Sequence, residues 1–208
     1  PMTTGIKNII FDFGGVIINI DYFRTRNAFV KLGVNNFDEL FNQFKQNTIF
    51  DEFETGKIDE QKFFTELESL TKKQISRKDS LEAWNAMLLD FPKRNYEFIK
   101  NIKNKYRIFL LSNTNETHLK YYFKKLEMWY GIENMDPLFE KCYYSCRVNL
   151  RKPDVEIFDF VIKNSNLVPE ETLFIDDSPQ HVEGARKAGL KAYHLQEPEG
   201  IIDVVNSL

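Results

Sequence analysis

Charged and hydroxyl side chains follow four apolar segments of this chain, at the points where those segments end. Asp12 ends the segment KNIIFD, and Ser112 ends YRIFLLS. The pair Asp176 and Asp177 ends TLFIDD, and Lys152 lies in the stretch after KCYYS. Carboxylates gathered at one point repel one another, and a bound cation relieves that repulsion. All-oxygen ligands favour Mg²⁺, which proteins usually bind through one or two carboxylates together with a substrate phosphate.

The groups beside these carboxylates are those that bind a phosphate dianion. Asn113 follows Ser112, and the cations Arg151 and Lys152 lie next to each other in RVNLRKPD. Hydroxyl, amide and ammonium groups all donate hydrogen bonds to phosphate oxygens. Pro153 disfavours helix at Lys152, so a helix can begin after the lysine and leave its side chain free to point into the site.

Asp12 lies beside two glycines, in FDFGGV, that allow the backbone to approach a ligand closely. A carboxylate next to a bound metal ion can attack phosphorus and form an aspartyl-phosphate. A second carboxylate two residues later would suit acid–base chemistry, but that position is Gly14. Asp21 and His118 are the nearest other proton donors by sequence, and we expect both at the surface or near the hinge of an inserted segment.

These groups converge only if parallel strands of one sheet carry them. Predicted strands are residues 7–12, 106–112, 141–145, 172–177 and, with a weaker pattern, 190–195. Helical patterns occupy residues 92–104, 115–129, 154–166 and 178–189. Ser178, Pro179 and Gly189 have the residue types of a helix start and stop. Strands alternating with helices predict an α/β fold with a parallel sheet covered on both faces, and ligands bind such sheets at the carboxyl ends of the strands.

Residues 20–89 break the alternation because they contain only helical patterns. Gly33 and Gly56 fall where helices should end. We therefore predict an α/β core domain of residues 1–19 and 90–208, with an all-helical cap domain at 20–89. Phenylalanine is abundant in this insert, and we interpret most of it as the core of a small helical bundle.

The composition is that of an ordinary globular protein, with 42% hydrophobic residues, 28% charged residues and a net charge of −3. The sequence has no block of basic residues that would indicate nucleic-acid binding. It also has no apolar run long enough to indicate a membrane span. The N-terminal residues 1–8 lack the pattern of a signal peptide, so we expect a cytoplasmic protein. Cys142 and Cys146 are too far apart for a disulfide if CYYSC is extended. The three histidines show no ligand spacing for zinc.

The chain resembles the haloacid dehalogenase-like hydrolase superfamily in four motifs, FDFGGV, LLSNTN, RKPD and FIDDS. They occur in the family's order and cover nearly the whole chain. Within the superfamily, the first two motifs resemble the branch of α-D-glucose-1-phosphate phosphatase-like proteins. The resemblance implies a Rossmann-like three-layer core with a helical cap, inserted after the first strand, that closes over the active site and selects the substrate.

The resemblance also implies a Mg²⁺ cofactor and its ligands. Asp12 would be both the nucleophile and a metal ligand, and Gly14 would give its backbone carbonyl to the metal. Asp177 would bind Mg²⁺ directly, and Asp176 directly or through water.

For the substrate, a small phosphomonoester such as a sugar phosphate, the resemblance implies three further roles. Ser112, with Asn113, would bind the transferring phosphoryl group. Lys152 would neutralise charge on Asp12 and on the phosphate.

The sequence departs from this family at Gly14, where most of its phosphatases carry an acid–base aspartate. Such a group typically contributes a factor of about 10²–10⁴ in rate. A phosphatase for an easy leaving group, such as a sugar 1-phosphate, fits this departure best. A catalytically weak or inactive phosphate- and metal-binding relative is an alternative. A 2-haloacid dehalogenase is a further one, because halide leaves without a proton, although that chemistry would leave the acidic pair of FIDDS unexplained.

Overall fold

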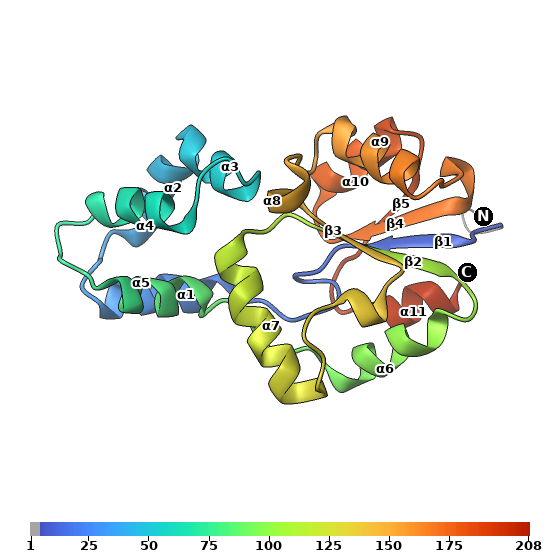
Figure 1. The fold of residues 1–208 in the computed structure, drawn as a ribbon, viewed down its shortest axis with the longest axis horizontal. Helices are drawn as coiled ribbons and strands as arrows, with labels where there is room; N and C mark the ends of the chain where they lie inside the picture. The colour runs from blue at the N-terminus through green and yellow to red at the C-terminus, as the bar shows by residue number, and fades with distance from the viewer. Residues whose placement is uncertain (1–4) are drawn as a thin grey trace.

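The computed structural model describes residues 5–208, and its centre is a parallel sheet of five strands (Figure 1). The strands are β1 (Asn8–Phe11), β2 (Arg107–Ser112), β3 (Lys141–Tyr144), β4 (Thr172–Asp176) and β5 (Lys191–His194). Their order is β3-β2-β1-β4-β5, and every neighbouring pair is parallel. The predicted α/β class and all five predicted strands are confirmed. Residues 1–4, part of the stretch inspected for a signal peptide, lie outside the described residues.

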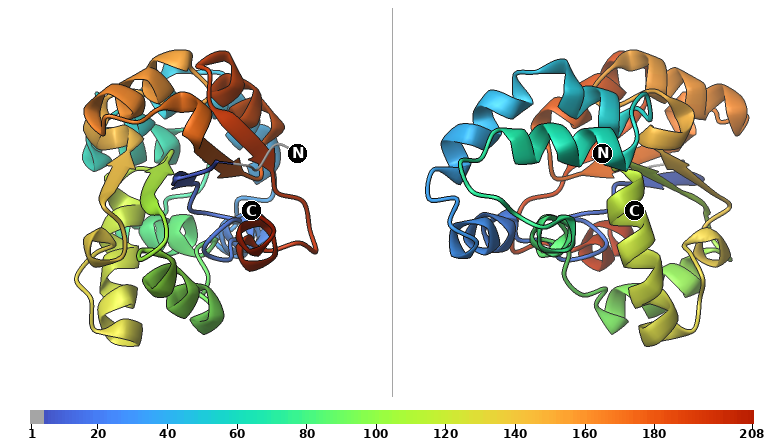
Figure 2. Two further views of the ribbon diagram at one scale, coloured as in Figure 1. Left: turned by 90° about the vertical axis from the view of Figure 1, so that its right-hand side faces the viewer. Right: turned by 60° about the vertical axis from the view of Figure 1, so that its left-hand side comes forward.

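Helices cover both faces of the sheet and make three layers (Figures 1 and 2). One face carries α6 (Lys93–Ile102), α7 (Glu116–Tyr130) and α11 (Ile201–Asn206), and the other carries α9 (Val155–Asn164) and α10 (Pro179–Lys187). The short helix α8 (Ser145–Val148) and the 3₁₀ turns η1 (Asp136–Leu138) and η2 (Pro169–Glu171) complete this part of the chain. The Rossmann-like three-layer core is therefore observed.

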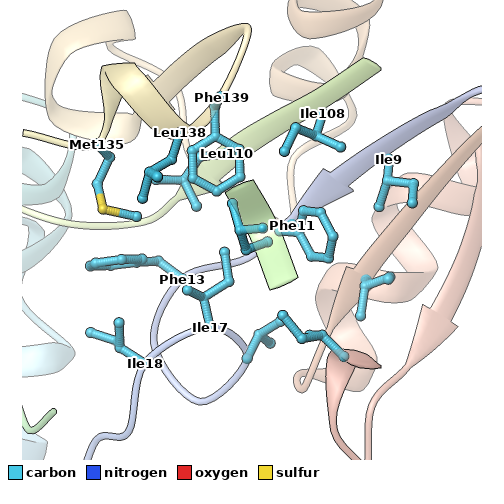
Figure 3. Packing of buried hydrophobic residues seen from close by; sticks show 14 of the residues in the cluster. Ile9, Phe11, Phe13, Ile17, Ile18, Ile108, Leu110, Met135, Leu138 and Phe139 are labelled. Atoms are coloured by element: carbon cyan, nitrogen blue, oxygen red, sulfur yellow. The ribbon is translucent and has the colours of Figure 1, made fainter. Parts of the chain in front are cut away.

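The strands are uninterrupted apolar runs because both faces of the sheet are buried. Ile9 and Phe11 of β1 enter the cluster under α6, α7 and α11, whereas Ile10 enters the cluster under α9 and α10. Figure 3 shows the first cluster, in which Met135 and Leu138 also pack on the strands. The stretch that follows α7 is therefore a packed surface loop, held by buried apolar side chains.

Five helices, and none of the five strands, lie in the predicted cap segment of residues 20–89. They are α1 (Tyr22–Lys31), α2 (Phe37–Lys45), α3 (Thr48–Glu54), α4 (Glu60–Ser69) and α5 (Arg77–Asn85). Gly33 and Gly56 follow α1 and α3 with φ of 96° and 72°, as expected for helix stops. The helices share a separate aromatic core formed by Phe29, Phe37, Phe41, Phe44, Phe53, Phe63, Phe64 and Trp84. The interpretation of these phenylalanines as core is confirmed, and the division into two domains stays a prediction that this separate core favours.

Two adjacent segments connect the helical segment to the sheet. The backbone N–H of Asn19 donates to Asp90 O at 3.0 Å, and that of Leu89 donates to Asn19 O at 3.0 Å. The side chain of Asn19 also donates to Asp90 Oδ1 at 2.9 Å. The outgoing and returning chains of the helical segment are thus paired where they cross to the sheet.

Three smaller expectations have mixed outcomes. Ser178 precedes α10 but does not cap it through its side chain, whose hydroxyl donates to Gln180 Oε1 at 2.9 Å. Cys142 and Cys146 are both free, as expected. Among residues 5–208, no helix combines the length and the hydropathy required to cross a bilayer.

Candidate active site

The strand order brings the predicted site residues to one edge of the sheet. β1 lies between β2 and β4, so Asp12, just after β1, lies between the ends that carry Ser112 and Asp176. The N–H of Asp12 donates to Ile175 O at 3.0 Å, which extends the pairing of β1 with β4 by one residue. Asp12, Ser112 and Asp176 are all buried. The predicted convergence at the carboxyl ends of the strands is therefore observed for these three residues.

Lys152 is the cation of this site and is completely buried, with 0% of its surface exposed. Its Nζ donates to Asp12 Oδ1 at 2.8 Å, to Asp176 Oδ2 at 2.8 Å and to Leu111 O at 3.0 Å. An ammonium group has three N–H donors, so protein oxygens accept all of them. The contact of Lys152 with a phosphate stays a prediction, and with its three donors used within the protein the lysine would act there through its charge.

Asn113 holds the backbone of Lys152 from both sides. Its Nδ2 donates to Lys152 O at 2.8 Å, and its Oδ1 accepts from Lys152 N at 2.9 Å. This reciprocal pair ties the loop after β2 to the loop after β3 and fixes where the lysine side chain starts. The amide of Asn113 is thus occupied within the protein, and its contact with a phosphoryl group stays a prediction for its backbone.

Charge in the site is unbalanced, because one lysine faces three carboxylates. Burial raises the pKa of Asp12 to about 7, with Lys152 opposing that shift and Asp176 adding to it. Burial and the neighbouring Asp176 also raise the pKa of Asp177. Although burial acts in the opposite direction, Lys152 and then His181 hold the pKa of Asp176 below its ordinary value. An added cation at this point would relieve the repulsion among the three carboxylates.

The same carboxylates fit a divalent metal ion by position as well as by charge. Asp12, Asp176 and Asp177 each offer a carboxylate oxygen, and these oxygens lie within 4.8 Å of one another. Gly15 keeps the space open, because a Cβ on it would lie 2.4 Å from Asp177 Oδ2. Its φ of +79° favours glycine as well. The backbone carbonyl of Gly14 as a further ligand stays a prediction.

Gly14 borders Ile20, which takes part of the space that a larger side chain would need. A Cβ on Gly14 would lie 3.3 Å from both Cδ1 and Cγ2 of Ile20. Ile20 belongs to the chain crossing into the helical segment and is 43% exposed. The place of the missing acid–base group is thus bordered by an apolar side chain.

Arg151 does not join the site, and the expectation that both cations of RVNLRKPD converge there is wrong for this residue. Its Nη1 lies 2.8 Å from Asp51 Oδ1 and its Nη2 lies 2.7 Å from Glu54 Oε1. Both carboxylates belong to α3 of the helical segment. Successive residues in this extended loop point in different directions, and Lys152 takes the direction of the site.

Two histidines contact the acidic pair and were not predicted. His181 Nδ1 lies 3.0 Å from Asp176 Oδ2, and His194 Nε2 lies 3.1 Å from the backbone oxygen of Asp177. The one available signal was that His181 falls in the first turn of the helix that follows FIDDS.

The two tentative proton donors are engaged elsewhere. Asp21 caps α1 by accepting the N–H of Phe23 at 3.0 Å. His118 stacks on Trp84 at a ring-centroid distance of 5.1 Å and contacts Trp84 O at 3.2 Å. Both residues therefore lie at the junction of core and helical segment, as expected from the sequence.

Known proteins share this sequence pattern and this fold. A family model described as haloacid dehalogenase-like hydrolase matches residues 6–189. The D-ribitol-5-phosphate phosphatase of Bacteroides thetaiotaomicron is 33% identical over 198 residues, which are 95% of this chain and 94% of that protein.

Solved structures give the same result. A HAD family enzyme of Bacteroides thetaiotaomicron, in complex with magnesium and inorganic phosphate, has 33% identity and a TM-score of 0.87 over 96% of this chain and 99% of that chain. A HAD-like family hydrolase of Porphyromonas gingivalis has 31% identity and a TM-score of 0.86 over 98% of each chain. With its four motifs gathered at one end of the sheet, the chain belongs to the haloacid dehalogenase-like hydrolase family.

Proposed function

We propose that this protein is a Mg²⁺-dependent phosphatase that hydrolyses a small phosphomonoester through an aspartyl-phosphate on Asp12. The observation that carries the proposal is the cluster of buried Asp12, buried Asp176 and exposed Asp177, with Lys152 bound to the two buried carboxylates. The complex of a related enzyme with magnesium and inorganic phosphate supports the binding of Mg²⁺ and phosphate by this chain. The metal would be held by the three aspartates and would offset negative charge on the phosphoryl group.

The residues of the chain divide the chemical work. Lys152 donates to Oδ1 of Asp12, so we assign the attack on phosphorus to Oδ2. The new bond joins Asp12 to phosphorus while the bond to the leaving oxygen breaks. Water then attacks phosphorus and the bond between Asp12 and phosphorus breaks, which releases phosphate and regenerates the carboxylate. The proton that this water loses balances the one that the leaving oxygen takes from solvent. We assign to Ser112, which ends β2 and is buried, the hydrogen bond to a phosphoryl oxygen.

The substrate class that we propose is a sugar or sugar-alcohol phosphate. Gly14 offers no acid to protonate the leaving oxygen, which favours a sugar 1-phosphate because an anomeric hydroxyl is a comparatively acidic leaving group. The name of the Bacteroides relative, D-ribitol-5-phosphate phosphatase, extends the class to sugar alcohols with an ordinary primary leaving group.

A substrate panel tests this function. Phosphate release is measured from α-D-glucose 1-phosphate, D-ribitol 5-phosphate and p-nitrophenyl phosphate, with Mg²⁺ or with EDTA. Turnover should require Mg²⁺ and should vanish in Asp12→Asn. Activity that persists in either condition contradicts the mechanism. Binding of Mg²⁺ and phosphate without turnover would support the inactive relative, and chloride release from 2-chloropropionate would support the dehalogenase.

A further inference from the structure

The loop that carries Lys152 also contacts the helical segment. This loop, residues 146–152, follows β3, includes most of α8, passes beside α3 and ends at Lys152. Lys152 faces Asp12. Three other residues of this loop contact the helical segment, namely Cys146, Asn149 and Arg151. One short piece of backbone therefore touches both parts of the molecule that would have to meet during catalysis.

Arg151 makes the strongest of these contacts. It bridges Asp51 at 2.8 Å and Glu54 at 2.7 Å, and only 12% of the Glu54 side chain is exposed. A buried carboxylate without a cation is costly, so Glu54 depends on Arg151 for its charge balance. Arg151 Nε is also buried and has no hydrogen-bond partner in the structure. The guanidinium is thus held in the interface rather than in solvent.

Two neighbouring contacts fix the same interface. Asn149 Nδ2 donates to Thr55 O at 2.8 Å. The backbone of Gly56 lies so close to the loop that a Cβ on it would lie 2.1 Å from Cys146 O. Because backbone lies against backbone here, this contact fixes the relative position of the two segments.

The contact at Arg151 reaches Lys152 through one peptide bond. The backbone of Lys152 is held by Asn113 on one side, and Arg151 O accepts the N–H of Asp154 at 3.1 Å on the other. Arg151 therefore anchors the residue before Lys152, and together with the Asn113 pair it sets where the lysine side chain begins. Misplacement of a catalytic group by about 1 Å can cost as much as about 10²-fold in rate.

We propose that Arg151 is a positioning residue, whose ion pairs with Asp51 and Glu54 couple docking of the helical segment to the placement of Lys152 against Asp12. The proposal rests on the proposed function for its catalytic consequence. The contact itself is independent of it. Arg151 touches no reacting atom and acts only through the neighbouring lysine.

Kinetics of a double-mutant cycle test the coupling. Arg151→Gln should lower kcat by about 10- to 100-fold, with a smaller change in KM, because the lysine loses its position after substrate has bound. Arg151→Lys should recover part of that loss. Combining Glu54→Gln with Arg151→Gln should cost less than the sum of the two single changes, since no buried carboxylate is then left without its cation. Additive effects of the two single changes would overturn the proposal.

Arg147→Gln is the matched control, because Arg147 lies in α8, in the same connection between β3 and Lys152, but pairs with Glu116, 2.9 Å away in α7. That exposed pair should matter little, so kcat should stay within about twofold of the parent chain. An equal loss of kcat in Arg147→Gln and Arg151→Gln would show a general effect of the loop and would contradict the proposal.

Hydrogen exchange gives a readout that needs no substrate. Amides of residues 54–58 should exchange faster in Arg151→Gln than in the parent chain and should be unchanged in Arg147→Gln. Unchanged exchange in both variants contradicts the docking role. If the parent chain hydrolyses none of the panel, the proposed function fails, while this exchange measurement still decides whether Arg151 holds the interface.

Discussion

Lys152 Nζ lies 2.8 Å from Asp12 Oδ1, although 140 positions separate the two residues in the chain. Asp176 is the second carboxylate on the same ammonium group, also at 2.8 Å. The three side chains come from the end of β4 and from the connections after β1 and β3, so the contact exists only in the folded sheet. Site chemistry and fold stability therefore depend on the same ion pair.

Lys152→Met should cost both stability and activity. The change leaves two buried carboxylates without their cation, and breaking a buried pair in this way typically costs about 3–5 kcal/mol. Chemical denaturation measures the loss. Lys7→Met is the control, because Lys7 pairs with Glu171 at 3.0 Å on the surface and should lose less than about 1 kcal/mol. Equal losses for the two lysines would contradict a structural role for the buried one.

Gly14→Asp should restore an acid–base group once Ile20 gives way. A Cβ at this position would lie 3.3 Å from Ile20. The variant that combines Gly14→Asp with Ile20→Ala should therefore hydrolyse substrate faster than Gly14→Asp alone. General acid catalysis should raise the rate by about 10-fold or more for ribitol 5-phosphate, and less for p-nitrophenyl phosphate, whose leaving group needs no proton. Gly14→Ala with Ile20→Ala controls for the change in space. Equal gains on both substrates would show that a missing proton is not what limits the rate.

Gly15→Ala should weaken Mg²⁺ binding. Its Cβ would lie 2.4 Å from Asp177 Oδ2 and would displace that carboxylate. Gly131→Ala is a matched control, since Gly131 has a similar positive φ of 68° and no atom within 4 Å of a Cβ. Both variants should lose about 1 kcal/mol from backbone strain. Calorimetric titration should show weaker Mg²⁺ binding only in Gly15→Ala, and unchanged affinity there would argue against Asp177 as a ligand.

His118 should make stability depend on pH. Burial lowers the pKa of His118 from 6.5 to about 4, with its contact to Trp84 O opposing the shift. The unfolded chain therefore binds more protons than the folded chain between these two values, so this contribution to stability falls as pH falls through that window.

Denaturation at two pH values checks this expectation. Between about pH 7 and about pH 5, the parent chain should lose about 1–2 kcal/mol more than His118→Gln, which has no titrating ring. An identical loss in both chains would mean that His118 is protonated as easily in the folded state as in the unfolded one.

Much of the fold followed from the sequence because its signals are local. Continuous apolar runs gave the strands, since β1 buries Ile9 and Ile10 on opposite faces. The strand ends then located Asp12, Ser112 and Asp176, because parallel strands share one edge.

The remaining features depend on side-chain direction, which the sequence does not encode locally. Arg151 and Lys152 are adjacent, yet one pairs with α3 and the other with Asp12. Ser178 has the residue type of a helix cap, but its hydroxyl donates to the side chain of Gln180 instead. The search for histidines at metal-ligand spacing did not single out His181, because its partner in the structure is the carboxylate of Asp176.

Trapping the covalent intermediate tests the central claim most directly. The protein is mixed with Mg²⁺ and a substrate labelled in its phosphoryl group, quenched in acid and digested for peptide mapping. The label should appear on the peptide that contains Asp12, should be released by hydroxylamine as an acyl phosphate is, and should be absent from Asp12→Asn. Label on another peptide, or turnover retained in Asp12→Asn, would contradict an aspartyl-phosphate on this residue.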